Sequence, residues 1–400
     1  MVAGIIVLDA NKIQSRISAM KILYYYWGEN SKEDCIECME ALGYKVSVFA
    51  MHMKNYVSDP HFIEAINAKL KEGFDCLFSF DYFPLLSEVA MDSGLPYISW
   101  VYDSPHYTLE SVTLNNPCNH VYLFDYGLTE QYRNEGCNTV EYMPLACNTK
   151  RLDRICSPII SSSSYKHEVT FLGNLYNDEN NFYDQINYLP AYLKGYFDAI
   201  IASQSHVYGY DLSAQLINDE ISAETARYVQ ADLGGGFRSA RNEILRNMLR
   251  KKVTVNERHD LIKRLGDNFS VDLYAPVKPT ADIHVSFKGY ADYRDQMPII
   301  FASSKININI TLRSILTGIP LRIVDILGAG GFVLSNYQAE FAEYFAYGES
   351  IVWFDSPEDL IEKCAYFLVH DEERETIARR GHDIAVKAFD YAVLLPRIFI

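Results

Sequence analysis

An arginine and an aspartate lie three positions apart on one predicted helix, and together they have the chemistry to hold a phosphate and a ribose. The sequence predicts this helix from Pro320 to Ala329, with Gly330-Gly331 ending it. Apolar side chains cover most of its circumference, and Arg322 and Asp325 occupy the narrow polar stripe that remains. The helix N-terminus and Arg322 could bind an anion, and Asp325 could accept hydrogen bonds from a ribose diol. An Arg–Asp ion pair at a domain surface is the alternative interpretation.

A carboxylate and an imidazole are also three positions apart in the first half of the chain. Asp103 and His106 follow a buried strand predicted at Pro96–Val101. Ligands bind beyond the carboxyl ends of strands in doubly wound sheets, so this pair is a candidate catalytic site. There the carboxylate could orient a hydroxyl or stabilise positive charge, and the imidazole could transfer a proton. Alternatively, Asp103 only caps the turn after the strand.

Two further motifs favour structural interpretations. Cys35-Ile36-Glu37-Cys38 lies within a predicted helix, and no second cysteine or histidine pair follows at zinc spacing, so we expect no metal site. Gly234-Gly235-Gly236 has neither a preceding strand nor a following Lys-Ser/Thr pair. A flexible bend is therefore expected there rather than a phosphate loop.

The composition excludes several classes of partner. A formal net charge of −16 argues against nucleic acid or an anionic membrane as the main partner. No apolar run approaches the ~18 residues that span a bilayer, so no transmembrane segment is expected. Eight cysteines scattered through the chain, and a Val2–Leu8 run too short for a signal sequence, predict a cytoplasmic protein with reduced thiols.

The order of the predicted elements indicates an α/β protein with mostly parallel sheets. A length of 400 residues favours two domains, and the stretch with Pro158 and Ser161-Ser162-Ser163-Ser164 has a composition that suits a hinge rather than a core. We predict domains over residues 1–150 and 168–400, a hinge over 151–167, a helical insertion at about 180–267 and a C-terminal helical tail, with residues 1–19 unassigned. Strands are predicted at Ile22–Trp27, Lys45–Met51, Asp75–Phe80, Pro96–Val101, His120–Phe124, Thr139–Met143, Val169–Leu172, Val271–Tyr274, His284–Phe287, Lys305–Ile310, Phe332–Ser335 and Ile351–Phe354.

Several of these motifs together resemble a known family. The part from Ile283 to Tyr391 is similar to the group 1 glycosyltransferases, in the branch of the spore-maturation CgeB-like proteins. The shared features are an Asn-x-Asn strand, a glycine loop, the Arg322/Asp325 helix, a glycine pair, and the S-P-E-D-L and E-E-R-x-x-I-A-R-R-G runs. The first part resembles the uncharacterised domain that often precedes this module. The residues that carry this second likeness are Phe78–Pro84, Tyr97–Pro105 and Met143–Ala146.

The resemblance implies a GT-B fold, in which two Rossmann-like domains face each other across a cleft. It also implies a metal-independent, hexosyltransferase-type enzyme with no cofactor besides its donor, a UDP-sugar. Asp325 stands where the family has a ribose-binding glutamate, and the family's basic pair after Gly173 is replaced by Asn177-Asp178-Glu179. The residues expected at the donor are Gly173, Asn174, Tyr290, Asn309, Arg313, Gly318, Arg322 and Asp325.

The expected activity is transfer of a sugar, with retention of the anomeric configuration, to a glycan, protein or small-molecule acceptor held by the first domain. Asp103 and His106 would act on the acceptor side. Two alternatives stay open: a nucleotide-sugar epimerase, and a catalytically inert protein that binds glycans or nucleotides on the same scaffold.

Overall fold

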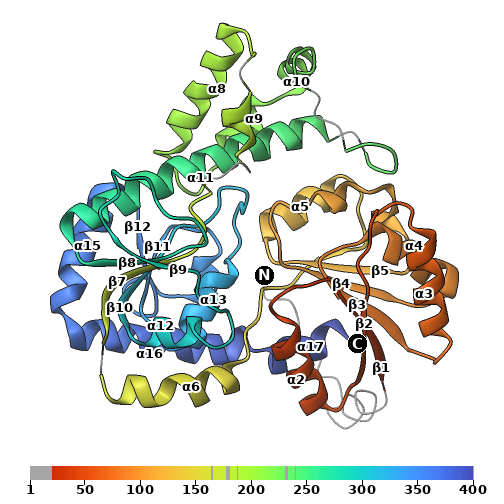
Figure 1. Cartoon of the computed structure of the whole chain (residues 1–400), viewed down its shortest axis with the longest axis horizontal. Helices are drawn as coiled ribbons and strands as arrows, with labels where there is room; N and C mark the ends of the chain where they lie inside the picture. The colour runs from red at the N-terminus through yellow and green to blue at the C-terminus, as the bar shows by residue number, and fades with distance from the viewer. Residues whose placement is uncertain are drawn as a thin grey trace.

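Two parallel six-stranded sheets form the two halves of the molecule in the computed structural model, which describes residues 20–163, 165–176, 181–186, 188–229, 233–238 and 240–399. Figure 1 shows the two sheets side by side, each covered by helices on both faces. This is the GT-B arrangement that the sequence predicts. Residues 1–19 and Asn177-Asp178-Glu179 lie outside the described residues.

The N-terminal sheet has the order β2-β1-β3-β4-β5-β6. Its two central strands, β3 and β4, are buried along their whole length, which explains why they read as continuous apolar runs. Helices α3 and α4 pack on one face, and α2 packs on the other. The elements are β1 (Lys21–Tyr26), α2 (Lys32–Leu42), β2 (Lys45–Ala50), α3 (Pro60–Leu70), β3 (Cys76–Phe80), α4 (Pro84–Ser93), β4 (Tyr97–Val101), η1 (Tyr107–Glu110), η2 (Val112–Asn115), β5 (Asn119–Leu123), α5 (Tyr126–Asn134) and β6 (Val140–Tyr142).

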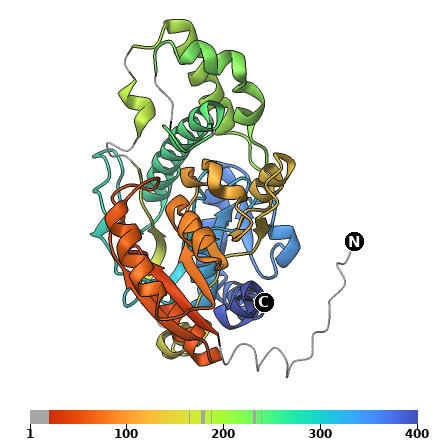
Figure 2. The same cartoon turned by 90° about the vertical axis from the view of Figure 1, so that its right-hand side faces the viewer.

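The C-terminal sheet has the order β12-β11-β10-β7-β8-β9, so β10 and β7 lie at its centre. Helices α7 to α11 intervene between β7 and β8, and Figure 2 shows this green insertion standing at one end of the molecule. The elements are β7 (His167–Leu172), α7 (Phe182–Gln185), α8 (Ala191–Gln204), α9 (Leu212–Leu216), α10 (Asp219–Thr225), α11 (Arg241–Asn268), β8 (Val271–Tyr274), β9 (Ser286–Gly289), α12 (Met297–Ala302), β10 (Ser304–Asn309), α13 (Leu321–Gly328), β11 (Val333–Asn336), α14 (Phe341–Tyr344), β12 (Val352–Phe354), α15 (Pro357–Val369) and α16 (Asp371–Ala388).

The segment between the sheets differs from the predicted hinge. Most of it is helix α6 (Thr149–Ser161), in which Pro158 is accommodated near the C-terminal end. Leu152 and Cys156 of this helix are buried in the core of the C-terminal domain. The first part of this segment therefore contributes to a core, because α6 presents an apolar face although its last residues are polar, and the hinge over residues 151–167 stays a prediction. The domain boundaries at residues 150 and 167 stay a prediction.

The C-terminal helix returns to the first domain. Helix α17 (Tyr391–Ile398) packs against α2, and its Tyr391 and Leu394 are buried in the core on that face of the N-terminal sheet. The Cys147 amide donates to Phe389 O at 2.8 Å, and the Tyr391 amide donates to Cys147 O at 3.1 Å, which fixes the crossing. Residues 391–398 therefore complete the first domain, although chain order places them in the predicted second one.

A polar contact joins the loops at the facing edges of the two domains. The Asp125 carboxylate, at the N-terminus of α5, accepts hydrogen bonds from the amides of Leu316 and Thr317 in the other domain. The Thr317 hydroxyl lies 2.9 Å from Asp125 Oδ1 and 2.8 Å from Glu340 Oε1. A side chain at Gly318 would come within 2.9 Å of Phe124 O, so glycine is required there by the close approach of the domains.

Candidate functional site

Arg322 and Asp325 both lie on α13 as predicted, but they do not form a salt bridge with each other. Asp325 is 7% exposed and accepts a hydrogen bond from the Tyr293 hydroxyl at 3.1 Å. Burial raises the pKa of the Asp325 carboxyl to about 7, although the Arg322 charge opposes this shift. Arg322 is half-buried, with Nη1 3.1 Å from Met297 Sδ. The surface ion pair considered from the sequence is therefore absent, and no carboxylate of the described residues forms a salt bridge with Arg322.

A second arginine, which the sequence analysis missed, lies close to Arg322. Arg258 belongs to α11 of the insertion and is 8% exposed. Its guanidinium donates to two backbone carbonyls, Asn174 O after β7 and, at 2.6 Å, Ile310 O after β10. Its buried Nε has no hydrogen-bond partner among the described residues. Arg258 is thus held at the carboxyl ends of the two central strands, and it forms no salt bridge with a carboxylate of the described residues.

Burial affects both arginines, and the like charge of Arg322 acts on Arg258. Burial lowers the pKa of the Arg258 guanidinium, and the neighbouring positive charge of Arg322 lowers it further. Two guanidinium groups to which no described carboxylate is bonded make a site that is electrostatically unfavourable when empty and favourable for an anion. Planar guanidinium forks match the geometry of phosphate oxygens. The arrangement therefore has the chemistry of a phosphate or diphosphate site.

The Gly173-Asn174 loop forms the other wall of this site. The Gly173 amide donates to Tyr274 O at 2.9 Å, and a Cβ at Gly173 would lie 3.9 Å from Arg258 Nη1. Tyr176, which has a positive φ of 54°, places its ring 5.0 Å from the Arg258 guanidinium carbon. The structure therefore brings Gly173, Asn174 and Arg322 together around Arg258, at the sheet edge where ligands bind in such folds.

Arg313 has another partner. Its guanidinium makes a forked ion pair with the Glu257 carboxylate of α11, and Nη1 also donates to Val207 O at 2.8 Å. The structure thus uses Arg313 to hold the insertion helix against the loop after β10. Arg258, one residue beyond Glu257, is therefore the second arginine beside the Gly173-Asn174 loop, in place of the predicted donor residue Arg313.

The remaining predicted donor residues lie at different distances from the arginines. Asn309 is buried at the end of β10, and its amide nitrogen donates to Thr311 Oγ1 and Ser335 Oγ at 2.9 Å each. Gly318 is at the domain contact described above. Tyr290 follows the edge strand β9 and is 64% exposed. Their predicted donor-binding roles stay predictions.

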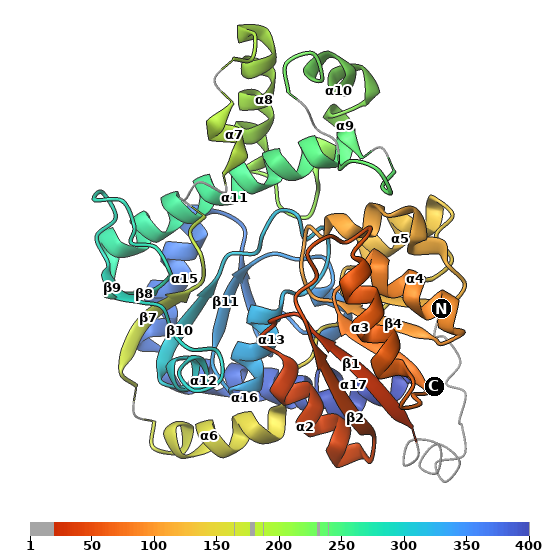
Figure 3. The ribbon, with the colours of Figure 1, turned by 45° about the vertical axis from the view of Figure 1, so that its right-hand side comes forward.

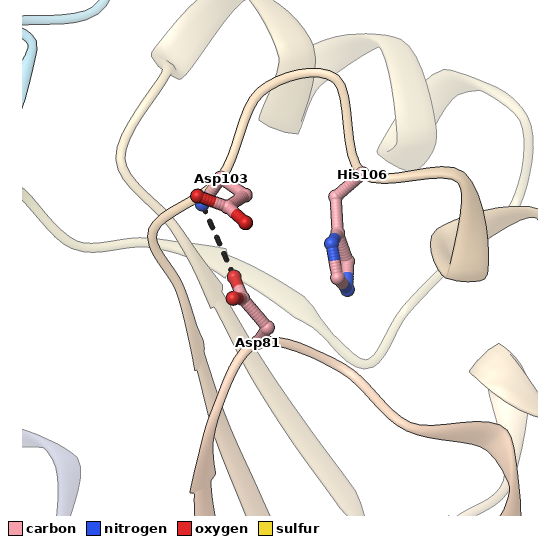
Figure 4. Close-up of side chains that lie close together, drawn as sticks. All are labelled: Asp81, Asp103 and His106. Atoms are coloured by element: carbon pink, nitrogen blue, oxygen red, sulfur yellow. Dashed lines mark hydrogen bonds between the residues drawn. The ribbon is translucent and has the colours of Figure 1, made fainter. Parts of the chain in front are cut away.

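In the N-terminal domain the structure brings Asp103 and His106 together with a third residue, Asp81. A carboxylate oxygen of Asp81, a carboxylate oxygen of Asp103 and a ring nitrogen of His106 all lie within 4.8 Å of one another. Figure 4 shows the His106 ring beside the two carboxylates, which come from the loops after β3 and β4. Asp81 Oδ1 accepts the amides of Tyr102 at 2.9 Å and Asp103 at 3.1 Å. It is Asp81, therefore, that anchors the loop after β4, and Asp103 is left open to solvent.

Asp103 has the properties of an acid or base. Although solvent reaches its side chain, the surrounding protein and then the neighbouring Asp81 charge raise the pKa of Asp103 to about 6, while His106 opposes the shift. A carboxyl group with a pKa near the working pH can both accept and release a proton. His106 Nε2 lies 2.6 Å from the Thr108 hydroxyl and 3.1 Å from the Tyr82 amide nitrogen, so that ring atom is already engaged.

The two halves of the site face each other through neighbouring loops. Ser104, next to Asp103, exchanges two hydrogen bonds with Ser314: each hydroxyl donates to the other residue's carbonyl oxygen, at 3.0 and 3.1 Å. Leu312 and Ser314 belong to the loop that follows β10 and Ile310, whose carbonyl binds Arg258. The carboxylate cluster and the arginine pair are thus on opposite sides of one interdomain contact.

The structure also describes the two other motifs singled out in the sequence. Cys35 and Cys38 lie in α2 and are buried, and burial raises the pKa of both thiols, that of Cys38 to about 12. Gly236 lies against the N-terminal domain, where its carbonyl accepts the Val112 amide at 3.1 Å. No helix of the described residues is both long and apolar enough to cross a bilayer.

Comparison with known proteins supports a glycosyltransferase. Residues 250–398 match a family described as glycosyl transferase-like, a stretch that contains Arg258, Arg322 and Asp325. No curated protein sequence is similar enough to match the chain. The match supports the broader family that the sequence motifs indicate.

Solved structures establish the same fold. The sucrose-phosphate synthase of Thermosynechococcus elongatus superposes with a TM-score of 0.54 at 10% identity, covering 94% of this chain and 97% of that one. Alr3699/HepE of Anabaena, solved in complex with UDP-glucose, gives 0.50 at 10% identity, covering 95% and 98%. A UDP-forming trehalose-phosphate synthase of Burkholderia xenovorans gives the same TM-score, identity and coverage. At these identities the similarity shows the two-domain fold.

Proposed function

We propose that this protein is a glycosyltransferase that moves a sugar from a nucleotide-diphosphate donor to an acceptor hydroxyl. The observation that carries the proposal is the pair of arginines, Arg258 and Arg322, at the carboxyl ends of the central strands of a GT-B domain. Alr3699/HepE of Anabaena, which shares this fold, was solved in complex with UDP-glucose, so a UDP-sugar is the proposed donor. The family match over residues 250–398 supports the same reaction class.

The arginines act on the leaving group. The bond between the anomeric carbon and the diphosphate oxygen breaks, and the nucleoside diphosphate departs with the electron pair. Arg258 and Arg322 stabilise the negative charge that develops on it, and they carry out what a divalent cation would otherwise do, so we propose a metal-independent mechanism. The acceptor hydroxyl oxygen forms the new bond to the anomeric carbon, and its proton passes to the departing phosphate or to a carboxylate.

Asp103 is the proposed acceptor-side carboxylate, with His106 beside it. Its position across the domain contact from the arginines places it to orient the acceptor hydroxyl or to stabilise oxocarbenium-like charge. We propose retention of configuration, since no second strong base is needed when the leaving phosphate takes the acceptor proton. Asp325 is the proposed ribose ligand. Its buried carboxyl can accept a hydrogen bond when ionised and donate one when protonated.

Two finer assignments belong to the same proposal. We place the protein in the CgeB-like branch of the family, on the motifs quoted above, with a hexose as the transferred sugar. A cytoplasmic location is proposed because eight cysteines, all free, suit a reducing compartment.

Incubation of the purified chain with a panel of radiolabelled UDP-, GDP-, ADP- and TDP-sugars tests the proposal. We expect one nucleotide sugar to release its nucleoside diphosphate, with the label transferred to an acceptor or to water. Interconversion of two nucleotide sugars would instead indicate an epimerase. Binding without turnover across the panel would indicate an inert scaffold, and either result would refute the proposed transfer.

A further inference from the structure

A cavity of about 780 Å³ lies between the N-terminal domain, the insertion and the loop after β10. Ser104, Pro105 and Tyr107 line it from the first domain, and helices α7 and α11 line it from the second. Figure 3 shows α11 extending across the C-terminal domain towards α5 of the other one. The cavity adjoins both halves of the candidate site, because Ser104 follows Asp103 and its other wall includes Tyr176, the ring packed on Arg258.

Most of the cavity wall is apolar. Tyr107, Phe182 and Tyr188 contribute rings, and Ile244 and Met248 of α11 contribute aliphatic surface. Phe182 is 63% exposed and Tyr188 is 62% exposed, so these rings are not used to fill the protein core. Exposed rings that border a recess favour a ligand with an apolar or ring-bearing body.

The polar side chains of the wall are mostly engaged by the protein itself. Ser104 and Ser314 donate to each other's carbonyl groups. Asn247 donates to Glu243 at 3.1 Å and accepts from Arg250 at 2.9 Å. A ligand with many hydroxyl groups would leave several of them without partners here, which is unfavourable for each group. A sugar-like body is therefore a poor fit.

One cation is directed at this apolar space. Lys251 is the only charged side chain among the described residues that line the cavity. It is half-buried, and its Nζ lies 5.0 Å from the centre of the Tyr176 ring. No described carboxylate forms a salt bridge with it, whereas its neighbour Lys252 binds Asp184 at 2.7 Å. An ammonium group without a bonded counter-ion among the described residues, beside an apolar recess, favours a ligand that carries one anionic group.

We infer that the cavity binds the acceptor, and that the acceptor is a hydroxyl compound with an apolar, ring-bearing body and a single anionic group, paired with Lys251. The identification of this ligand as the acceptor rests on the proposed glycosyltransferase function, whereas the ligand chemistry rests on the cavity itself. The anionic group is a carboxylate or a phosphate.

Titration calorimetry on the full chain tests the ligand chemistry without requiring turnover. The probes are 6-hydroxy-2-naphthoate and 2-naphthyl phosphate as apolar anions, naphthalene-2,6-diol as the neutral counterpart, and glucose 6-phosphate as a polyhydroxylated anion. We expect the naphthyl anions to bind at least tenfold more tightly than the diol and than glucose 6-phosphate. The tighter of the two anions then identifies the acidic group. Equal affinity for the anions and the diol, or tighter binding of glucose 6-phosphate, would overturn the inference.

Substitution of the lysine assigns the effect to the cavity. Lys251→Met should weaken naphthoate binding at least tenfold and leave the diol within about twofold, because the aliphatic stem is kept and the charge is lost. Lys263→Met is the matched control, since Lys263 lies on the same helix and pairs with Asp282 at 3.1 Å outside the cavity. A Lys251→Met protein that keeps wild-type naphthoate affinity would refute the role of this charge.

Parallel titration with UDP separates this inference from the proposed function. Naphthoate binding in a chain that binds no UDP and turns over no nucleotide sugar would refute the transferase proposal and leave the ligand class standing. With the donor selected by the nucleotide-sugar panel, 6-hydroxy-2-naphthoate should be glycosylated on its hydroxyl group. Binding of the naphthoate without its glycosylation, in a chain that does transfer sugar to other compounds, would overturn the acceptor assignment.

Discussion

Replacement of Arg258 by methionine should separate anion binding from folding. In the folded protein this arginine makes two hydrogen bonds to backbone carbonyls, and its charge is buried near Arg322 with no described carboxylate bonded to it. Loss of the hydrogen bonds destabilises the fold, while loss of the buried, repelled charge stabilises it. Because these effects oppose each other, we expect the free energy of unfolding to change by less than about 2 kcal/mol.

Binding of a diphosphate should respond more strongly than stability does. An anion neutralises the repulsion on the buried charge of Arg258, and it leaves the hydrogen bonds to the carbonyls in place. A charge-assisted hydrogen bond to phosphate contributes about 1.5–3 kcal/mol, so the Kd for UDP should rise by about 10- to 150-fold in Arg258→Met. The Kd for uridine, which has no phosphate, should stay within about twofold. Calorimetric titration with UDP and uridine measures both, and urea unfolding measures stability.

The matched control is Arg264→Met on the same helix. Arg264 is exposed and pairs with Asp260 and Glu358, so its loss should change neither Kd. An unchanged Kd for UDP in Arg258→Met would refute the anion site. Equal weakening of UDP and uridine would show that the substitution had distorted the nucleoside site rather than removed a phosphate contact.

Three further predictions concern carboxylates. Because the pKa of Asp103 is raised to about 6, the rate of a transfer that needs its ionised form should increase as pH rises through 6. Asp103→Asn should lose this pH dependence and at least tenfold of the rate, while its affinity for UDP stays within about twofold. A pH dependence that persists in the variant would assign it to another group. Asp325 has a folded-state pKa of about 7, above its ordinary value of 3.8, so its stabilising contribution is complete below pH 4 and is lost as pH rises through 7. The free energy of unfolding of Asp325→Asn, measured in urea, should therefore exceed that of the wild type by up to about 4 kcal/mol at pH 8 and by less at pH 5. A difference that does not change with pH would contradict a buried carboxyl with a raised pKa. Asp125→Asn places an amide nitrogen where the amides of Leu316 and Thr317 donate, so it should lower the free energy of unfolding by about 1–3 kcal/mol and increase the radius of gyration in X-ray scattering. The control Asp92→Asn, at an exposed position, should change neither quantity. If both quantities are unchanged in Asp125→Asn, this contact does not hold the domains together.

The strands could be predicted from the sequence, and so could much of the candidate site that they position. Each predicted strand is present, because buried parallel strands leave apolar runs that periodicity detects, and the order of the elements indicated two α/β domains, for which the family resemblance implied the GT-B arrangement. Arg322 and Asp325 were found from their spacing on one helix, which is local information. Asp103 and His106 were found from their position after a strand, and the structure confirms that they lie close together.

Contacts between distant parts of the chain could not be predicted in this way. Arg258 lies 84 positions from Asn174, within a long helix where many charged residues share the same pattern, so no local signal distinguishes it. The pairing of Arg313 with Glu257 could not be predicted for the same reason, because these two residues are also far apart in the chain. Asp81 was missed because its partners are the amides of the next strand's loop. Helix α17 returns to the first domain through tertiary packing that chain order does not reveal.

The most direct test of the central claim is the rate at which nucleoside diphosphate is released from the nucleotide sugar that the panel selects. This rate should be measured with and without acceptor in the wild type and in the Arg258→Met/Arg322→Met double variant. If the two arginines stabilise the departing diphosphate, release should be fast in the wild type, increase with acceptor, and fall at least 100-fold in a double variant that remains folded. Release at the wild-type rate by the folded double variant would contradict the account.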